Sequence, residues 1–223
     1  MKKVVIKLGT GILSAGNSKI HKARLAKLAN GIQAECKTQE TQVIVVSSGA
    51  VGLGMGMLGI DSRPTDLALL RACAGIGQCL LMNAWTEALR KVGLVAAQVL
   101  LTRDDFNERV RSQKVQETLE ALLAQGVVPI VNENDSVSDE EIKFGDNDVL
   151  SALLCSLGKA DLLVILSTAK GLMTHPESGD LVPFVAEITP AIEQMAKGTE
   201  SPTAVGGMVT KIEAAKIATK SGC

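Results

Sequence analysis

Residues 43–52 read Val-Ile-Val-Val-Ser-Ser-Gly-Ala-Val-Gly, a short apolar run that meets a polar, glycine-containing turn. Its first four residues are all β-branched and have no polar residue among them. Such a run is typical of a strand that is buried on both faces of a parallel sheet. The Ser-Ser-Gly that follows is where the strand should end. This stretch favours an α/β fold with polar loops at the ends of its strands.

The same pattern recurs along the chain and alternates with helical spacing. Further strands are expected at residues 4–8, 95–101, 127–131 and 162–166, and helices at 20–35, 66–92, 107–124 and 207–220. Strands that alternate with helices indicate right-handed βαβ crossovers. We therefore predict a three-layer α/β/α sandwich with a mainly parallel central sheet.

We expect one domain over residues 1–223, since neither a repeat nor a low-complexity tract divides the chain. Residues 173–190 are expected to leave the main sheet as an excursion such as a hairpin, and residues 197–207 to form a loop. The sequence stops at Ser221-Gly222-Cys223, just after a predicted helix, where a further strand would be expected. C-terminal strands of the sheet are therefore expected to be missing.

Composition argues against several classes of protein. The net charge of −1 gives no bulk attraction to nucleic acid, and four aromatic residues leave little for base stacking. Five cysteines without a C-x-x-C pair indicate reduced thiols in a cytoplasmic protein. No apolar run reaches the roughly 18 residues of a membrane helix. Two histidines offer little for a metal site, and none is predicted.

Polar or glycine-rich segments follow nearly every predicted strand. In an open parallel sheet these ends form the ligand-binding edge, where glycine lets backbone N–H groups approach phosphate oxygens. The segments are Lys7-Leu8-Gly9-Thr10-Gly11, Ser47-Ser48-Gly49-Ala50-Val51-Gly52, Asn132-Glu133-Asn134-Asp135-Ser136 and Ser167-Thr168-Ala169-Lys170-Gly171, with the loop Gly145-Asp146-Asn147-Asp148 before another helix-like stretch. The chain has neither a P-loop motif nor a dinucleotide-binding G-x-G-x-x-G in the right place.

Two lysines stand next to these segments and favour phosphoryl transfer. Lys7 ends the first strand, and Lys211 opens a helix after Gly206-Gly207. Lysines placed on opposite sides can stabilise the charge on a transferring phosphoryl group. A carboxylate acceptor is ionised at pH 7 and needs no general base, so the scarcity of histidine favours an acyl-phosphate-forming kinase.

Several motifs together resemble the glutamate 5-kinase family of the amino acid kinase superfamily. They run in order along essentially the whole chain: Lys7-Leu8-Gly9-Thr10, Val46-Ser47-Ser48-Gly49-Ala50, Leu100-Leu101-Thr102-Arg103-Asp104-Asp105, Val131-Asn132-Glu133-Asn134-Asp135, Phe144-Gly145-Asp146-Asn147-Asp148 and Gly206-Gly207-Met208-Val209-Thr210-Lys211. The resemblance implies phosphorylation of the L-glutamate γ-carboxylate by ATP with Mg²⁺, the latter held mainly through the nucleotide. It also implies a place in proline synthesis and feedback inhibition by proline.

The resemblance further implies roles for individual residues. Catalysis would rest on Lys7, Lys211 and Asp148, and glutamate would be bound by Ser48, Asp135 and Asn147. The nucleotide would be bound by Lys7, Gly9, Ser167, Thr168, Val205, Gly206, Gly207, Met208, Val209, Thr210 and Lys211. Asp135 would face the substrate ammonium. The oligomeric state usual in the superfamily implies a homodimer or homotetramer.

Three features depart from the family pattern. Thr168 stands where an aspartate is usual, Val205 where threonine is common, and the chain ends early, with no room for a PUA-type domain. Two alternatives to a glutamate kinase therefore stay open. One is an inactive pseudokinase that binds glutamate or proline, and the other is an amino acid kinase with a different carboxylate or carbamate acceptor.

Overall fold

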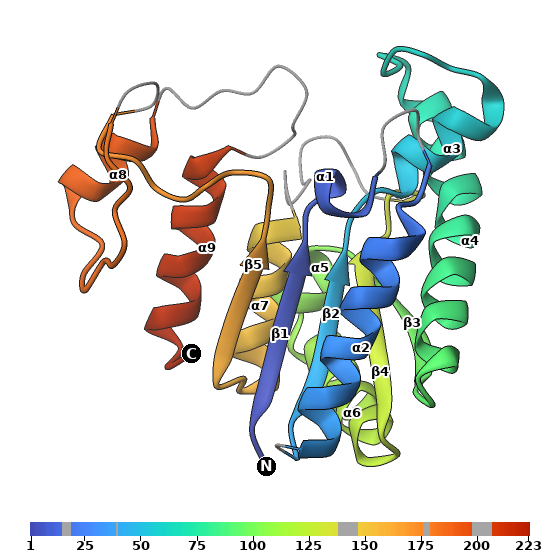
Figure 1. The fold of residues 1–223 in the computed structure, drawn as a ribbon, viewed down its shortest axis with the longest axis horizontal. Helices are drawn as coiled ribbons and strands as arrows, with labels where there is room; N and C mark the ends of the chain where they lie inside the picture. The colour runs from blue at the N-terminus through green and yellow to red at the C-terminus, as the bar shows by residue number, and fades with distance from the viewer. Residues whose placement is uncertain (15–18, 39, 138–146, 176–178, 198–206) are drawn as a thin grey trace.

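The computed structural model describes residues 1–14, 19–38, 40–137, 147–175, 179–197 and 207–223. Within these ranges the strands form one five-stranded parallel sheet in the order β3-β4-β2-β1-β5 (Figure 1). Its strands are β1 (Lys3–Leu8), β2 (Gln42–Ser47), β3 (Val95–Leu101), β4 (Val127–Glu133) and β5 (Leu162–Leu166). Because all the strands run the same way, their carboxyl ends meet at a single edge.

Helices cover both faces of the sheet and complete the predicted α/β/α sandwich. One buried cluster joins the sheet to α2 and α4, and a second joins its other face to α6 and α7. The helices are α1 (Thr10–Leu13), α2 (Lys22–Thr38), α3 (Ala50–Leu58), α4 (Leu67–Lys91), α5 (Asp104–Asn107), α6 (Arg109–Ala124), α7 (Asn147–Gly158), α8 (Pro190–Ala196) and α9 (Met208–Lys220). The expected fold class is confirmed.

The period of two along a strand decides which residues face which layer. In β2, Val43 and Val45 join the α2/α4 cluster, whereas Ile44 and Val46 join the α6/α7 cluster. Both sets are buried, which explains the unbroken apolar run in the sequence. In β1 the same alternation puts Lys7 on the side of Val5, which belongs to the cluster containing α7.

Four features differ from the sequence-based expectation. The predicted end of the loop at 145–148 was wrong, because Asn147 and Asp148 form the first turn of α7. Strand β4 runs on to Glu133, and α3 is a helix that periodicity did not predict. The expected helix at 107–124 is interrupted at Glu108, which has an extended backbone between α5 and α6.

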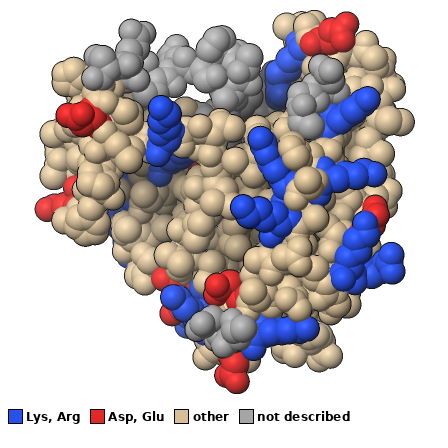
Figure 2. All heavy atoms as spheres, viewed as in Figure 1, with Lys and Arg blue, Asp and Glu red and all other residues tan. Residues whose placement is uncertain are grey.

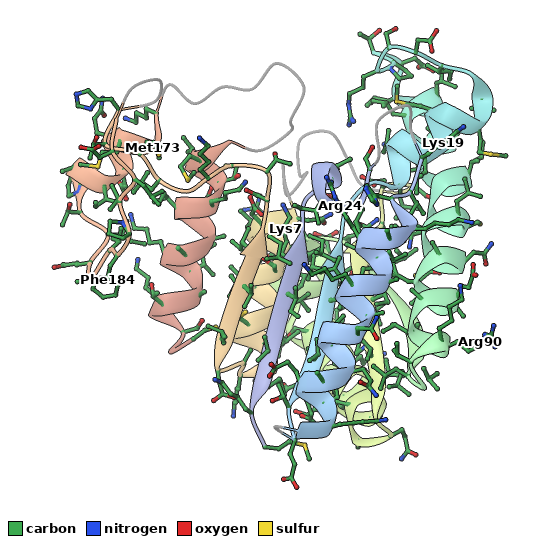
Figure 3. All side chains as sticks on the ribbon, in the orientation of Figure 1. Lys7, Lys19, Arg24, Arg90, Met173 and Phe184 are labelled. Atoms are coloured by element: carbon green, nitrogen blue, oxygen red, sulfur yellow. The ribbon has the colours of Figure 1, made fainter. Side chains whose placement is uncertain are left out.

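The segment between β5 and α8 leaves the sheet, as expected for residues 173–190. Met173 and Leu181 form an isolated antiparallel bridge, and Phe184 is exposed nearby (Figure 3). Most of the loop expected at 197–207 lies outside the described residues.

Charged side chains lie on the outside of the α2 layer. Lys22, Arg24 and Lys27 of α2 are exposed, and Figure 2 shows Lys and Arg side chains gathered over this face. Beside α2 in the same layer, α4 is long and apolar enough to span a membrane by length and composition alone, a test that core helices also pass. Leu81, Trp85 and Leu89 of α4 are buried in the cluster against the sheet.

Helices α3 and α4 approach one another closely through glycine. A Cβ at Gly77 of α4 would overlap the carbonyl oxygen of Ala50, the first residue of α3. A Cβ at Gly54 would likewise meet the carbonyl of Cys73. Since α3 begins at the end of β2, this contact fixes the start of α3 at the carboxyl edge of the sheet.

We expect Gly77→Ala to lower the free energy of unfolding by about 1–3 kcal/mol, because the new methyl group must push α3 away from α4. The matched control is Gly75→Ala on the same helix, where the nearest atom, Ser136 Oγ, is 4.0 Å from the added Cβ. That change should be neutral or stabilise by up to about 1 kcal/mol, since alanine favours a helix over glycine. Urea unfolding followed by circular dichroism measures both, and equal effects would contradict the close packing.

Helices α7 and α9 meet through small residues and thiols. Ala152 of α7 is buried with Ala214 and Ala218 of α9, and Cys223 packs against this group and against the cluster that contains Cys155. Burial raises the pKa of the Cys155 thiol well above its ordinary value, and the neighbouring Cys223 raises it further. Burial and Glu35 also raise the pKa of Cys36.

Alkylation of the native protein at pH 8 should modify the exposed Cys79 first, Cys36 more slowly and Cys155 last. The thiolate is the reacting species, and a raised pKa keeps the thiol protonated at this pH. Mass spectrometry of peptides from timed samples gives the order. The same experiment in urea is the control, where the differences should disappear. Rapid labelling of Cys155 in the native state would contradict the packing of α7 against α9.

Candidate active site

A buried carboxylate joins three distant parts of the chain at the carboxyl edge of the sheet. Asp148 Oδ1 lies 2.6 Å from Lys7 Nζ, and Asp148 Oδ2 lies 3.0 Å from Lys211 Nζ. Lys7 comes from the end of β1, where Figure 3 labels it, Asp148 from the first turn of α7, and Lys211 from the first turn of α9. The two lysines that the sequence singled out are thus brought together by one aspartate.

Helix α9 supplies a second group to this carboxylate. Thr210 Oγ1 lies 3.2 Å from Asp148 Oδ2 and 3.0 Å from the carbonyl oxygen of Gly207. Lys211 Nζ also lies 3.5 Å from the Gly207 carbonyl. The start of α9 is therefore tied to the start of α7 by charge-assisted hydrogen bonds, which are stronger than neutral ones.

The burial of these groups determines what the site can bind. The side chains of Asp148, Lys7 and Lys211 are 0%, 3% and 17% exposed, respectively. Two ammonium groups and one carboxylate leave a net charge of +1 in a region that water barely reaches. Each ammonium has three N–H donors and the carboxylate uses only part of them. This arrangement is complementary to an anion, most strongly one with several oxygens.

The end of β1 leaves space beside the Lys7 ammonium. A Cβ on Gly9 would lie 3.9 Å from Lys7 Nζ, so a residue with a side chain would fill that position. The Gly9 N–H, however, donates to the Leu166 carbonyl at 3.0 Å, in continuation of the β1–β5 pairing. The expectation that glycines here offer free N–H groups to phosphate therefore does not hold for Gly9, whose contribution is space.

Glycine has a conformational role at the end of β2. Gly49 adopts φ of 111°, in the region that residues with a side chain rarely enter, and it caps the N-terminus of α3. No side chain caps α3, and none caps α9 after Gly207. Uncapped helix N-termini present N–H groups and a partial positive charge to the same edge.

Neutral polar groups lie beside the charged centre. Asn147 Nδ2 donates to Ser48 Oγ at 2.7 Å and to Asn132 Oδ1 at 3.0 Å. Ser48 and Asn147, two of the three residues expected to bind substrate, are therefore in direct contact. Asp135, the third, is half-buried in the turn after β4. Asn147 Oδ1 is buried and has no hydrogen-bond partner among the described residues.

The end of β5 carries Ser167 and Thr168, which the sequence analysis expects to lie along the nucleotide. Ser167 Oγ accepts a hydrogen bond from the Ala169 N–H at 3.1 Å, which stabilises the turn. Thr168 is exposed, and its methyl group would lie 2.8 Å from a Cβ on Gly11, so this loop lies against α1. Gly207, Met208, Val209, Thr210 and Lys211 form the cap and first turn of α9. Val205 and Gly206 lie outside the described residues.

Two residues of this region carried no role in the sequence analysis. Gln78 of α4 accepts a hydrogen bond from Asn132 Nδ2 at 2.9 Å, and both side chains are buried. Asn132 is inside β4, on the side of Val128 and Ile130 that faces α4. The sequence placed Asn132 just after the strand predicted at 127–131, and the available signal for its burial was the period of two that continues from Val128 and Ile130. Gln78 sits in a helix with no local signal of function.

The profile of the amino acid kinase family matches residues 2–223. The chain belongs to this family. Curated relatives include the glutamate 5-kinases of Deinococcus radiodurans, 46% identical over 99% of this chain, and Streptococcus suis, 44% identical over 99%. A third, from Geobacter sulfurreducens, is 46% identical over the whole chain. The chain spans 60–63% of the length of these three relatives.

A solved structure supports the fold of this member of the family. A crystal structure of a protein from Aeropyrum pernix K1 superposes with a TM-score of 0.59 over 99% of this chain and 91% of that chain. Its sequence is 18% identical, so the likeness concerns the fold alone.

We expect Asp148→Asn to lower the free energy of unfolding by about 3–5 kcal/mol, because it leaves two nearly buried ammonium groups without their counter-charge. Urea unfolding provides the measurement. The matched control is Glu193→Gln, which removes a carboxylate from an ion pair between α8 and Lys216 of α9 that lies in solvent. That variant should unfold like the wild type within experimental scatter. Similar small effects in both would contradict a structural role for the Asp148 centre.

Proposed function

We propose that this chain carries the phosphotransferase centre of a glutamate 5-kinase, which transfers the γ-phosphoryl group of ATP to the γ-carboxylate of L-glutamate. The observation that carries the proposal is the meeting of Lys7 and Lys211 on the buried carboxylate of Asp148. The names of the curated relatives point to the same reaction. The matching family profile supports a kinase of small carboxylic or amino acids.

The chemistry requires few proton transfers. A carboxylate oxygen of glutamate forms a bond to the γ-phosphorus while the bond from that phosphorus to the bridging oxygen of ADP breaks. With an ordinary pKa of about 4.3, the acceptor is already ionised at pH 7, so no general base is needed. The described residues accordingly supply cations and hydrogen-bond donors at the site, with no histidine among them.

Charge stabilisation is the task left to the protein. In phosphoryl transfer the negative charge spreads over the equatorial oxygens of the transferring group. Lys7 from β1 and Lys211 from α9 would contact these oxygens, and Asp148 would hold both ammonium groups in place before the substrates arrive. Such preorganised cations in a dry site stabilise a developing charge more than water can.

The nucleotide phosphates would lie over the helix N-termini. Gly9 leaves space next to Lys7, while α3 and α9 each follow a glycine and lack side-chain caps. The N-terminus of α9, which follows Gly207, carries a partial positive charge that suits phosphate oxygens. Ser167 and Thr168, at the end of β5, would lie along the nucleotide.

Mg²⁺ is the expected companion of ATP in this reaction, where it neutralises phosphate charge. Among the described residues no group of three His, Cys, Asp or Glu side chains could hold a metal ion, and both Asp148 oxygens already face lysines. These residues fit a cation that is held by the phosphates and their waters. No step of the mechanism above therefore depends on a protein-bound metal.

The glutamate would lie on the side of Ser48, Asn147 and Asp135. Its ammonium requires an acceptor or an anion, which Asp135 and the free Asn147 Oδ1 can provide. Proline as a feedback inhibitor, homo-oligomer formation and a cytoplasmic location stay predictions, as does a single domain over residues 1–223. No described feature favours a pseudokinase, since both lysines and the aspartate are present and joined.

Incubating the protein with ATP, Mg²⁺, L-glutamate and hydroxylamine should yield γ-glutamyl hydroxamate, because hydroxylamine traps the acyl phosphate. Aspartate, N-acetylglutamate and carbamate serve as competing acceptors, and ADP release should be greatest with glutamate. The absence of product from a folded sample that binds ATP would contradict the proposal.

Replacing either lysine with methionine should lower kcat by about 10²–10³-fold, the usual effect of removing one donor to a transition-state charge. Lys216→Met, on the same helix α9 but paired with the exposed Glu193, is the matched control and should stay close to the wild type. Steady-state ADP release measures all three variants. A Lys7→Met variant as active as the Lys216→Met variant would contradict the assigned role.

A further inference from the structure

A chain of carboxamides runs from the edge of the sheet into helix α4. Asn147 of α7 donates both of its amide hydrogens, one to Ser48 Oγ and one to Asn132 Oδ1. Asn132 Nδ2 donates in turn to Gln78 Oε1. The Asn132 side chain is 3% exposed and that of Gln78 is 9% exposed. Four elements, α7, β2, β4 and α4, are thus linked by neutral hydrogen bonds.

One backbone group fixes the direction of this series of amide hydrogen bonds. The Glu133 N–H lies 3.0 Å from Asn132 Oδ1, and a backbone N–H can only donate. The atom of Asn132 at that position must therefore be the oxygen. Its nitrogen must face Gln78, which presents an oxygen, and Asn147 must present its nitrogen to Asn132. The orientations of all three side-chain amides therefore follow from which atoms can donate and which can accept.

This direction leaves Asn147 with one available atom. Both of its N–H hydrogens are used, and Oδ1 is buried without a partner among the described residues. A buried polar atom without a partner is rare and calls for an explanation. Oδ1 can only accept a hydrogen bond. Of the two α-substituents of glutamate, the carboxylate only accepts and the ammonium only donates, so the ammonium is the complement.

We infer that Gln78 is a positioning residue for recognition of the substrate's α-ammonium group. Its Oε1 holds the Asn132 amide, and Asn132 in turn holds Asn147 with Oδ1 toward the substrate. This inference rests on the proposed function, in which Asn147 binds glutamate. Gln78 does not touch the substrate in this role and acts only through Asn132 and Asn147.

The loss of Gln78 Oε1 would leave the Glu133 N–H as the remaining described group that fixes the direction of the Asn132 amide. Asn132 Nδ2 would then be buried without an acceptor, a state that a shift of this side chain away from α4 relieves. Because the same side chain accepts the hydrogen bond from Asn147, the shift would loosen the position of Asn147 Oδ1. The site would then lose complementarity to the ammonium.

The test compares L-glutamate with glutarate, which has a hydrogen in place of the ammonium. Gln78→Met keeps the length of the side chain and removes the hydrogen-bond acceptor. Gln78→Glu keeps an accepting oxygen toward Asn132. Cys79→Ser, at the exposed neighbouring position, is the control for a change in α4. For each protein, KM and kcat are measured with both acceptors and with ATP, and acceptor affinity is measured by calorimetry.

Gln78→Met should raise the KM for glutamate about tenfold or more, the effect of one lost hydrogen bond to a charged group. The KM for glutarate and for ATP should change by less than about threefold, since neither depends on the Asn147 acceptor. Gln78→Glu should keep most of the preference for glutamate, and Cys79→Ser should keep all of it.

Equal increases in KM for glutamate and glutarate would overturn the inference, because they would indicate a structural role only. An unchanged Gln78→Met variant, or a wild type that does not distinguish the two acceptors, would overturn it too. Calorimetry distinguishes a failure of the inference about Gln78 from a failure of the proposed function. If the wild type binds glutamate but forms no acyl phosphate, the function fails, and the ratio of the two affinities still decides the role of Gln78. If it binds no glutamate, both fail.

Discussion

The carboxylate of Asp148 is the group on which the rest of the site depends. It is fully buried and is paired with two ammonium groups that lie 141 residues before and 63 residues after it in the chain. A buried carboxylate requires such partners, and buried ammonium groups require the carboxylate, so the three are stable only together. This reciprocal need ties β1, α7 and α9 to one position, and the close packing of α7 on α9 through alanines maintains it. The ion pairs of the site and the packing of α7 on α9 therefore depend on each other.

Two kinds of polar contact lie at the carboxyl edge of the sheet, and they have different roles. The lysine–aspartate centre has a net positive charge, which suits phosphate oxygens regardless of the nucleotide's other features. The amide series from Asn147 to Gln78 is neutral, and in the role that we infer for it the selectivity would come from the direction of its hydrogen bonds. A neutral group held in one orientation discriminates between donor and acceptor without adding charge to the lysine–aspartate centre.

The parallel sheet explains why both contacts lie at the same place. Strand β2 is central, between β4 and β1, so the ends of these three strands are neighbours. Ser48 follows β2, Asn132 lies near the end of β4 and Lys7 near the end of β1. Helix α3 follows directly after Ser48, and Asn147 at the start of α7 contacts Ser48, so both helices begin at the same edge. Two glycines have different roles at this edge. Gly49 permits a backbone turn, and Gly9 leaves space beside Lys7.

The sequence alone determined the fold class and which segments meet at the carboxyl edge of the sheet. Buried strands had to appear as β-branched runs, and parallel strands had to place Lys7, Ser48 and the glycine loops at a common edge. The start of α7 was missed because Asn147 and Asp148 are also common in loops, and only the lysine contacts show why they belong to a helix. Tertiary structure alone decided that Asp148 joins two lysines, that the Gly9 N–H is used within the sheet, and that Gln78 reaches Asn132. Each of these depends on contacts between residues far apart in sequence, which local patterns do not record.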